Sequence, residues 1–257
     1  MSVWRRLTEA LTGPVAAPPR VLLGLDFDGT LADIAPTPEA ARLGPVTRRL
    51  LRRLAARPDV RLAVLSGRSL RDVKTKVGLE GVHYAGDHGL EIEGPGWRWT
   101  HPAATELDAA FAAVLRRDLR GVPGARVEPK SIGFAVHYRL VPRRRVPGLV
   151  RRVLERLASA GGRYRVLRSK LTLDVRSSVE WNKGHALEEI RARLPGRWSG
   201  VFIGDDRTDE EGFRTLGARA LTIRVGRPRA TAAGHVLPHR GHVDRLLRLL
   251  AERPLAR

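Results

Sequence analysis

The chain has 257 residues, 42% of them hydrophobic, no cysteine and a formal net charge of +20. This composition supports a buried core and excludes global disorder, disulfide bonds and thiolate metal sites. Aromatic residues make up only 5% and are not interleaved with the arginines, so the charge indicates a solvated basic surface and no nucleic-acid partner. No segment has the length of a membrane span and the first residues do not resemble a secretory signal, so we expect a cytoplasmic protein without membrane contact.

Short apolar segments alternate with amphipathic ones in the first and last parts of the chain. After a proline-containing lead-in over residues 1–20, the predicted strands are Val21–Phe27, Arg61–Leu65, Val82–Ala85 and Gly200–Ile203. The predicted helices are Pro45–Ala56, Ser69–Val77, Asn182–Leu194 and Asp209–Leu216. Strands that alternate with helices are typical of an α/β fold with a doubly wound parallel sheet.

The middle of the chain has a different order, in which a helix followed by two strands is predicted twice. The first set is Thr105–Leu119, Ala125–Glu128 and Ile132–Tyr138, and the second is Val146–Ala158, Tyr164–Leu167 and Leu171–Val175. This repeat predicts a small α+β cap domain over residues 104–178, inserted into a core of residues 21–103 and 179–257. The alternative is that these strands extend the main sheet.

Side-chain alternation within the predicted cap strands separates an apolar from a polar face. Phe134, Val136, Tyr138, Leu171, Leu173 and Val175 form the apolar set. The polar set contains His137, Arg139, Thr172, Asp174 and Arg176, with Glu128 and Lys130 in matching parity. We expect the apolar face to pack on two helices and the polar face to bind sugar hydroxyls, although an ordinary solvent-facing side remains the alternative.

Four polar clusters follow predicted strands or begin helices. They contain Asp26 and Asp28, then Ser66-Gly67-Arg68, then Lys183, and finally Asp205, Asp206 and Asp209. Ligands of open α/β sheets bind beyond the carboxyl ends of the strands, so we expect the four clusters to meet at one edge. Carboxylates gathered with a lysine and a hydroxyl suit Mg²⁺ and a phosphate group. Helix capping is the alternative for one of the last three aspartates.

In this order, the clusters resemble the four motifs of the haloacid dehalogenase superfamily of phosphohydrolases. The resemblance implies that Asp26 is the nucleophile and forms an aspartyl-phosphate. It implies that Asp28 protonates the leaving oxygen and later deprotonates the attacking water. Ser66 and Lys183 would bind and neutralise the phosphoryl group.

The same resemblance implies Mg²⁺ as the cofactor. The ion would be held by the side chain of Asp26, the backbone carbonyl of Asp28 and the side chain of Asp205. Asp206 and Asp209 would be additional ligands or would contact the ligands.

Three further segments indicate a narrower family. They are Gly86-Asp87-His88-Gly89-Leu90-Glu91, then Val127–Lys130 with Ala135–Arg139, and Leu173–Arg176 with Trp181–Gly184. These segments resemble those of trehalose-6-phosphate phosphatases, and the resemblance runs from Val21 to Gly217. It implies hydrolysis of trehalose 6-phosphate, the last step of trehalose biosynthesis. The substrate-binding residues that it implies are Gly67, Arg68, His88, Glu91, Lys130, His137, Arg139, Asp174 and Arg176.

Three positions depart from this family's pattern. Asp87 stands where asparagine is usual, Asp174 where glutamate is usual, and Ser177 where proline often follows the arginine. The substrates left open are sucrose phosphate, glucosylglycerol phosphate and mannosyl-3-phosphoglycerate. A phosphomutase and a basic nucleic-acid binder with a vestigial site also stay open. We expect a monomer, with a trehalose-phosphate synthase open as a partner.

Overall fold

The chain forms two compact units in the computed structural model, which describes Arg5, Leu7 and residues 20–102, 109–129, 133–169, 171–227 and 230–252. The core unit comprises Met1–Trp99 and Trp181–Arg257, and the cap unit comprises Thr100–Glu180. The domain limits expected from the sequence, residues 104 and 178, remain a prediction.

The core unit is built on an eight-stranded sheet in the order β12-β11-β10-β1-β2-β3-β4-β5. Its parallel strands are β1 (Val21–Asp26), β2 (Val60–Leu65), β3 (His83–Gly86), β10 (Ser199–Gly204), β11 (Ala220–Val225) and β12 (His235–Leu237). The strand β4 (Glu91–Gly94) pairs antiparallel to β3, and β5 (Trp97–Thr100) lies at the edge. The doubly wound α/β core that the sequence predicted is therefore confirmed.

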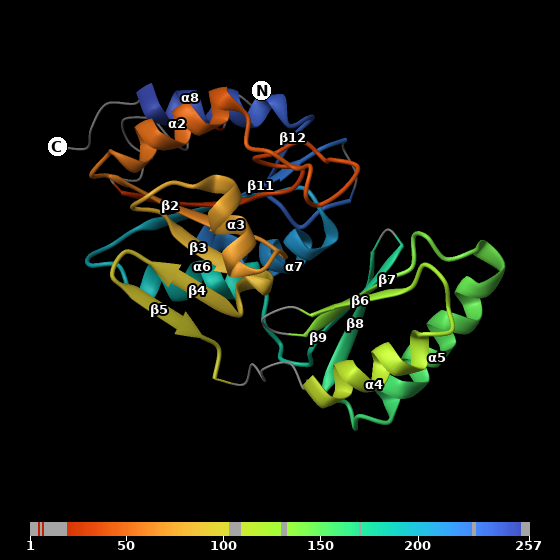
Figure 1. Cartoon of the computed structure of the whole chain (residues 1–257). Helices are drawn as coiled ribbons and strands as arrows, with labels where there is room; N and C mark the ends of the chain where they lie inside the picture. Colours follow the sequence, from red (N-terminus) through yellow and green to blue (C-terminus); the bar gives the residue numbers. More distant parts are fainter. Residues whose placement is uncertain are drawn as a thin grey trace. The chain divides into compact units, whose positions relative to one another are not determined.

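Helices cover both faces of this sheet because side chains alternate along its strands. In β1, Leu23 and Leu25 belong to one apolar cluster and Leu22 to the other. The helices α2 (Pro45–Ala55), α3 (Leu70–Val77) and α8 (Gly241–Glu252) pack on the first face (Figure 1). The helices α6 (Lys183–Ala192) and α7 (Arg207–Leu216) pack on the second. Every residue of β1 is buried, as a strand covered on both faces requires.

Helix boundaries in the core follow capping side chains. Ser69 and Asn182, which the sequence placed inside helices, are the N-caps of α3 and α6 and accept hydrogen bonds from backbone N–H groups there. Helix α7 begins two residues earlier than predicted, because Asp206 caps it and forms a capping box with Asp209. Each cap of this kind contributes about 1 kcal/mol to helix stability.

The cap unit contains a four-stranded antiparallel sheet in the order β6-β7-β9-β8 (Figure 1). Its elements are α4 (Ala109–Leu119), β6 (Arg126–Pro129), β7 (Phe134–His137), α5 (Val146–Ala158), β8 (Tyr164–Ser169) and β9 (Thr172–Ser177). Phe134, Val136, Leu173 and Val175 are fully buried with residues of both helices, which confirms the inserted α+β unit and these members of its apolar face.

The prediction for Leu171 is wrong. This residue lies before β9, has a φ of 62° and is 47% exposed, so it does not share the apolar face. A left-handed backbone conformation takes a residue out of strand alternation.

Leu7 of the expected loose lead-in is fully buried in the core cluster of the first face. No helix in the described part of the chain combines the length and apolar character that crossing a bilayer requires.

Candidate active site

Three parallel strands bring the predicted motifs to one edge of the core sheet. Asp26 is the last residue of β1 and pairs with Leu65 of β2, so Ser66 follows at the same level. On the other side, Leu25 pairs with Ile203 of β10, which places Gly204 opposite Asp26 and Asp205 immediately beyond it. The register thus places residues from distant parts of the sequence side by side.

Lys183 lies between two of the carboxylates. Its Nζ donates to Asp26 Oδ1 at 2.6 Å and to Asp209 Oδ1 at 2.7 Å, and the side chain is only 2% exposed. Burial alone would lower the pKa of the ammonium, but Asp209 and Asp26 reverse that effect and raise its pKa well above the ordinary value. Lys183 therefore remains a cation at neutral pH. Its position at the start of α6 is fixed by Asn182, whose side chain caps the helix.

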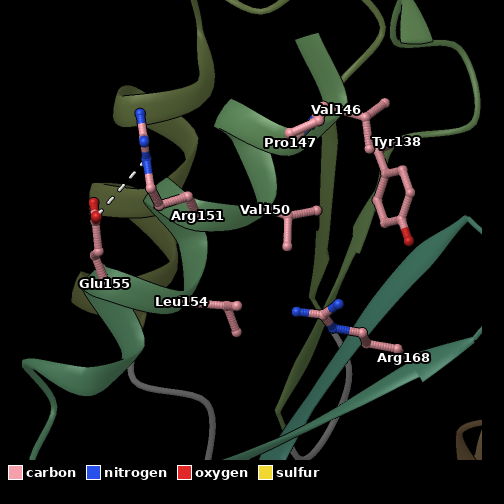
Figure 2. Close-up of a pocket in the computed structure, with 8 residues that line it drawn as sticks. All are labelled: Tyr138, Val146, Pro147, Val150, Arg151, Leu154, Glu155 and Arg168. Carbon is pink, nitrogen blue, oxygen red and sulfur yellow. Dashed lines mark ion pairs between the residues drawn. The ribbon is translucent and has the colours of Figure 1, made fainter. Parts of the chain in front are cut away.

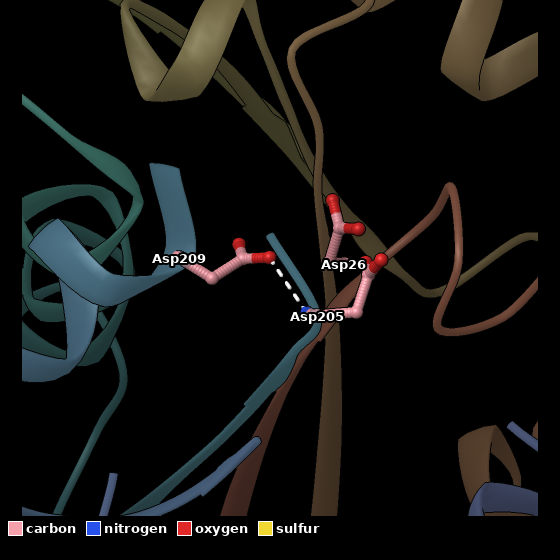
Figure 3. A group of neighbouring side chains, drawn as sticks. All are labelled: Asp26, Asp205 and Asp209. Carbon is pink, nitrogen blue, oxygen red and sulfur yellow. Dashed lines mark hydrogen bonds between the residues drawn. The ribbon is translucent and has the colours of Figure 1, made fainter. Parts of the chain in front are cut away.

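A cluster of three aspartates surrounds this lysine. Asp26, Asp205 and Asp209 can each direct one oxygen to a point where all three oxygens lie within 4.8 Å of one another (Figure 3). Burial raises the pKa of Asp205 to about 7, with Asp209 and Asp206 adding to the shift. Burial also raises the pKa of Asp26 well above its ordinary value, although Lys183 opposes the rise and the carboxylates of Asp209, Asp205 and Asp206 add to it. The cluster is short of positive charge and rich in oxygen donors, so its residues fit a hard divalent cation.

Two of the predicted metal residues are engaged by protein groups. Asp209 accepts from Lys183 through Oδ1, and through Oδ2 from the backbone N–H groups of Asp205 at 2.8 Å and Asp206 at 3.0 Å. Asp206 Oδ1 accepts from the N–H groups of Thr208 at 2.7 Å and Asp209 at 3.0 Å. Asp206 therefore has the capping role that the sequence left open, and Asp209 links the lysine to the loop of Asp205.

Asp28 contacts Arg68 in a bidentate ion pair. Arg68 Nη2 lies 2.6 Å from Asp28 Oδ1 and Nε lies 2.7 Å from Oδ2, while Nη1 donates to Asp72 at 2.7 Å. The guanidinium also lies over the ring of Phe27, with 5.4 Å to its centroid. The sequence indicates a substrate-binding role for Arg68 but not its pairing with Asp28, because no local pattern links residues 40 positions apart. The two hydrogen bonds fix the orientation of the Asp28 carboxyl group.

A strained loop after β3 completes this edge of the sheet. Asp87, His88 and Gly89 all have positive φ, at 48°, 59° and 98°, and such values cost a non-glycine residue about 1–3 kcal/mol each. The N–H of His88 donates to the carbonyl of Ser66 at 2.9 Å. A Cβ on Gly67 would lie within 2.5 Å of two atoms of the His88 imidazole, so residue 67 must be glycine for His88 to lie there. Gly67 and His88 are thus brought together.

The remaining predicted residues lie further along the chain. Glu91 is buried at the start of β4 and forms an ion pair with Arg98 at 3.3 Å. In the cap, His137 Nε2 lies 2.6 Å from Glu128 Oε2. Arg139 is exposed and Asp174 is buried. Lys130 and the side chain of Arg176 lie outside what the structure describes.

A separate hollow of about 550 Å³ lies in the cap unit (Figure 2). Side chains of α5, including Val150 and Leu154, form one wall, and Tyr138 and Arg168 lie across from them. None of its eight lining residues belongs to the predicted site. The hollow therefore does not correspond to the chemistry expected at the sheet edge.

The parallel sheet, the acidic edge with its buried lysine and the inserted cap together define the haloacid dehalogenase-like class of proteins. Two solved structures share this fold. The C-terminal domain of trehalose-6-phosphate phosphatase from Candida albicans aligns over 99% of this chain and 98% of its own, with a TM-score of 0.77 and 20% identity. A trehalose-6-phosphate phosphatase related protein aligns over 90% of this chain and 96% of its own, with a TM-score of 0.72 and 25% identity.

Sequence comparison narrows the class to a family. Residues 24–234 match the trehalose-phosphatase family, and the chain belongs to that family. The trehalose-phosphate phosphatase of Mycobacterium bovis is 40% identical over 261 residues, which cover 95% of this chain. The chain spans 65% of that relative's length.

Proposed function

We propose that this chain is a magnesium-dependent phosphatase that hydrolyses trehalose 6-phosphate to trehalose and inorganic phosphate. The observation that carries the proposal is the buried contact of Lys183 with Asp26 and Asp209 beside Asp205, in a chain of the trehalose-phosphatase family. The carboxylates of Asp26, Asp205 and Asp209, with Lys183 paired to two of them, would bind a phosphate dianion poorly without a further positive charge. We assign that charge to Mg²⁺, which prefers carboxylate oxygens and shares its shell with substrate phosphate.

Asp26 and Asp205 are the side chains that we propose as ligands of the ion, together with the backbone carbonyl of Asp28. Asp209 and Asp206 already accept hydrogen bonds from Lys183 and from backbone N–H groups, which supports a positioning role for both. When bound, the ion would neutralise charge on the phosphoryl oxygens and orient them towards the nucleophile.

The first chemical step is assigned to Asp26. Its carboxylate oxygen attacks phosphorus, the bond from phosphorus to the sugar oxygen breaks, and Asp28 gives its proton to the departing sugar hydroxyl. Lys183 offsets negative charge on the nucleophile and the phosphoryl group, and Ser66 donates a hydrogen bond to a phosphoryl oxygen. In the second step Asp28 takes a proton from water, whose oxygen attacks phosphorus. The bond between phosphorus and the Asp26 oxygen breaks, which releases inorganic phosphate and restores the Asp26 carboxylate.

Arg68 is proposed to change partners during this cycle. Arg68 donates to both oxygens of Asp28, which takes a proton from water in the second step. The first step needs a proton on one of these oxygens, so Arg68 gives up part of that contact, keeps its bond to Asp72 and turns to the substrate phosphate. We propose that Gly67, His88, Glu91 and the cap residues Lys130, His137, Arg139, Asp174 and Arg176 contribute to substrate binding.

A substrate panel tests the proposal. Phosphate release is measured from trehalose 6-phosphate, sucrose phosphate, glucosylglycerol phosphate and mannosyl-3-phosphoglycerate, each with Mg²⁺ and with EDTA. The expected result is the highest kcat/KM for trehalose 6-phosphate, with no turnover in EDTA. A higher kcat/KM for another ester would overturn the assignment of trehalose, and a phosphorylated isomer in place of free phosphate would indicate a mutase.

A further inference from the structure

Both backbone polar groups of Asp205 are held by side chains from other elements. Its N–H donates to Asp209 Oδ2 at 2.8 Å, and its carbonyl accepts from Arg224 Nη1 at 3.3 Å. Asp205 follows β10 in a short loop before α7. With both sides of the residue held, the direction of its Cα–Cβ bond is fixed, which limits the positions that its carboxylate can take. Thr30 Oγ1 contacts that carboxylate at 3.4 Å.

Arg224 is a buried cation that sequence analysis did not assign. It lies near the end of β11, pairs in register with Gly204 and is 4% exposed. A guanidinium inside a protein destabilises the fold unless charged and polar partners compensate it. Its Nε lies 3.9 Å from Glu210 Oε1, which supplies the countercharge. The shorter contact is the hydrogen bond to Asp205.

Glu210 is itself held firmly. It lies in the first turn of α7 and is 8% exposed. It accepts from Thr231 Oγ1 at 2.7 Å and from the N–H of Ala232 at 2.8 Å. These bonds tie α7 to the segment after β11, so Arg224 lies in a rigid setting. A rigid donor can fix the acceptor that it contacts.

The hydrogen-bond acceptor of Arg224 indicates that this residue does more than pack β11 against α7. A buried ion pair between Arg224 and Glu210 would be sufficient to join β11 to α7. The guanidinium additionally donates to the backbone of Asp205, whose carboxylate belongs to the acidic cluster. Groups that orient metal ligands from behind commonly change metal affinity about 10–100-fold when they are removed.

We infer that Arg224 is a positioning residue that holds Asp205 in the orientation required to bind the divalent cation. This inference rests on the proposed function, because it concerns the same metal site. Arg224→Met keeps an unbranched apolar side chain that can fill much of the space of the arginine stem, and it removes both the charge and the hydrogen bonds. We expect this variant to bind Mg²⁺ about 10–100-fold more weakly than the wild type. Arg224→Lys keeps the charge but lacks the planar arrangement of donors, so its Mg²⁺ affinity should lie between those of the wild type and Arg224→Met.

The experiment is isothermal titration of the full chain with Mg²⁺, with the melting temperature recorded with and without the ion. Arg57→Met is the matched control, since Arg57 is also largely buried, forms a close ion pair with Asp59 and donates to the carbonyl of Ala251. The Arg57→Met substitution should lower the melting temperature of the protein and leave its Mg²⁺ dissociation constant unchanged. If Arg224→Met does not fold, the same comparison is made with Arg224→Lys.

The outcomes separate the inference from the proposed function. Wild-type binding that Asp205→Asn abolishes and Arg224→Met leaves unchanged would overturn the inference and leave the function standing. Equal losses of affinity in Arg224→Met and Arg57→Met would overturn it as well, because both would then reflect general destabilisation. A wild-type chain that shows no Mg²⁺ binding would overturn the proposed function and this inference together.

Discussion

Gly29→Ala perturbs the acidic cluster through a single methyl group. Gly29 follows Asp28, has a φ of 87°, and its N–H donates to the carbonyl of Ala32 at 2.8 Å. A Cβ at this position would lie within 2.6 Å of both carboxylate oxygens of Asp205. Contacts under 3.0 Å are essentially never seen for a real Cβ, so Asp205 has to move.

Two effects of different size follow. The left-handed backbone conformation costs an alanine about 1–2 kcal/mol, which lowers the free energy of unfolding by that amount. A displacement of Asp205 by roughly 1 Å is sufficient to lower kcat/KM by about 100-fold, because catalytic groups depend steeply on their position. Mg²⁺ affinity should fall in parallel. Urea denaturation measures the first effect, and phosphate release with Mg²⁺ titration measures the second.

Gly96→Ala is the control that isolates the backbone contribution. Gly96 has a φ of 80°, but a Cβ there would meet no atom within 4 Å. The Gly96→Ala variant should lose about the same 1–2 kcal/mol of unfolding free energy and retain full phosphatase activity. If Gly29→Ala keeps wild-type kcat/KM, or if Gly96→Ala loses as much activity, the steric argument about Asp205 is refuted.

Three further predictions concern the charges of the cluster. Asp26→Asn should lower phosphate release at least about 10³-fold with an unchanged circular dichroism spectrum, since an amide is a poor nucleophile; substantial residual activity would exclude covalent catalysis by Asp26. At a concentration about 100 times its dissociation constant, Mg²⁺ should raise the free energy of unfolding of the wild type by about 2.7 kcal/mol and its melting temperature by roughly 5–10 °C. An equal rise in Asp205→Asn would contradict the assignment of Asp205 as a ligand. Lys183→Met should cost about 3–5 kcal/mol of unfolding free energy, because buried Asp26 and Asp209 lose their cation, and an unchanged urea midpoint would count against that pairing.

The core fold could be predicted because its strongest signals are local. The uninterrupted apolar segment of β1 identifies a central buried strand, and the residues that follow it are polar and acidic. The rule that sites form at the carboxyl ends of parallel strands then brings Asp26, Ser66 and Asp205 together, and the register confirms that proximity. Helix α8 was missed although Val243, Leu246, Leu247 and Leu250 recur at helical spacing, so that signal was present in the sequence.

Other features could not be predicted because they depend on contacts between distant residues. Arg224 resembles the surface arginines of a chain of net charge +20, yet it is buried behind Asp205. Arg68 was expected to bind the substrate, and its pairing with Asp28 could not be foreseen. Composition cannot separate a buried arginine from the solvated majority. Strand β11 was missed for a related reason, since Arg224 interrupts its apolar pattern. Asp206 was ambiguous, because a helix cap and a metal ligand place the same residue type at the same position.

The separation of the site along the chain has a consequence for specificity. Asp26 and Asp205 are 179 positions apart in sequence, yet the pairing of β1 with β10 brings them to the same edge of the sheet. The inserted cap has an apolar core of its own, built from residues between Phe111 and Val175. Its sheet can therefore change its polar residues without disturbing the register that assembles the acidic edge. We therefore expect that a departure such as Asp174 changes which sugar is bound and leaves the proposed phosphoryl chemistry intact.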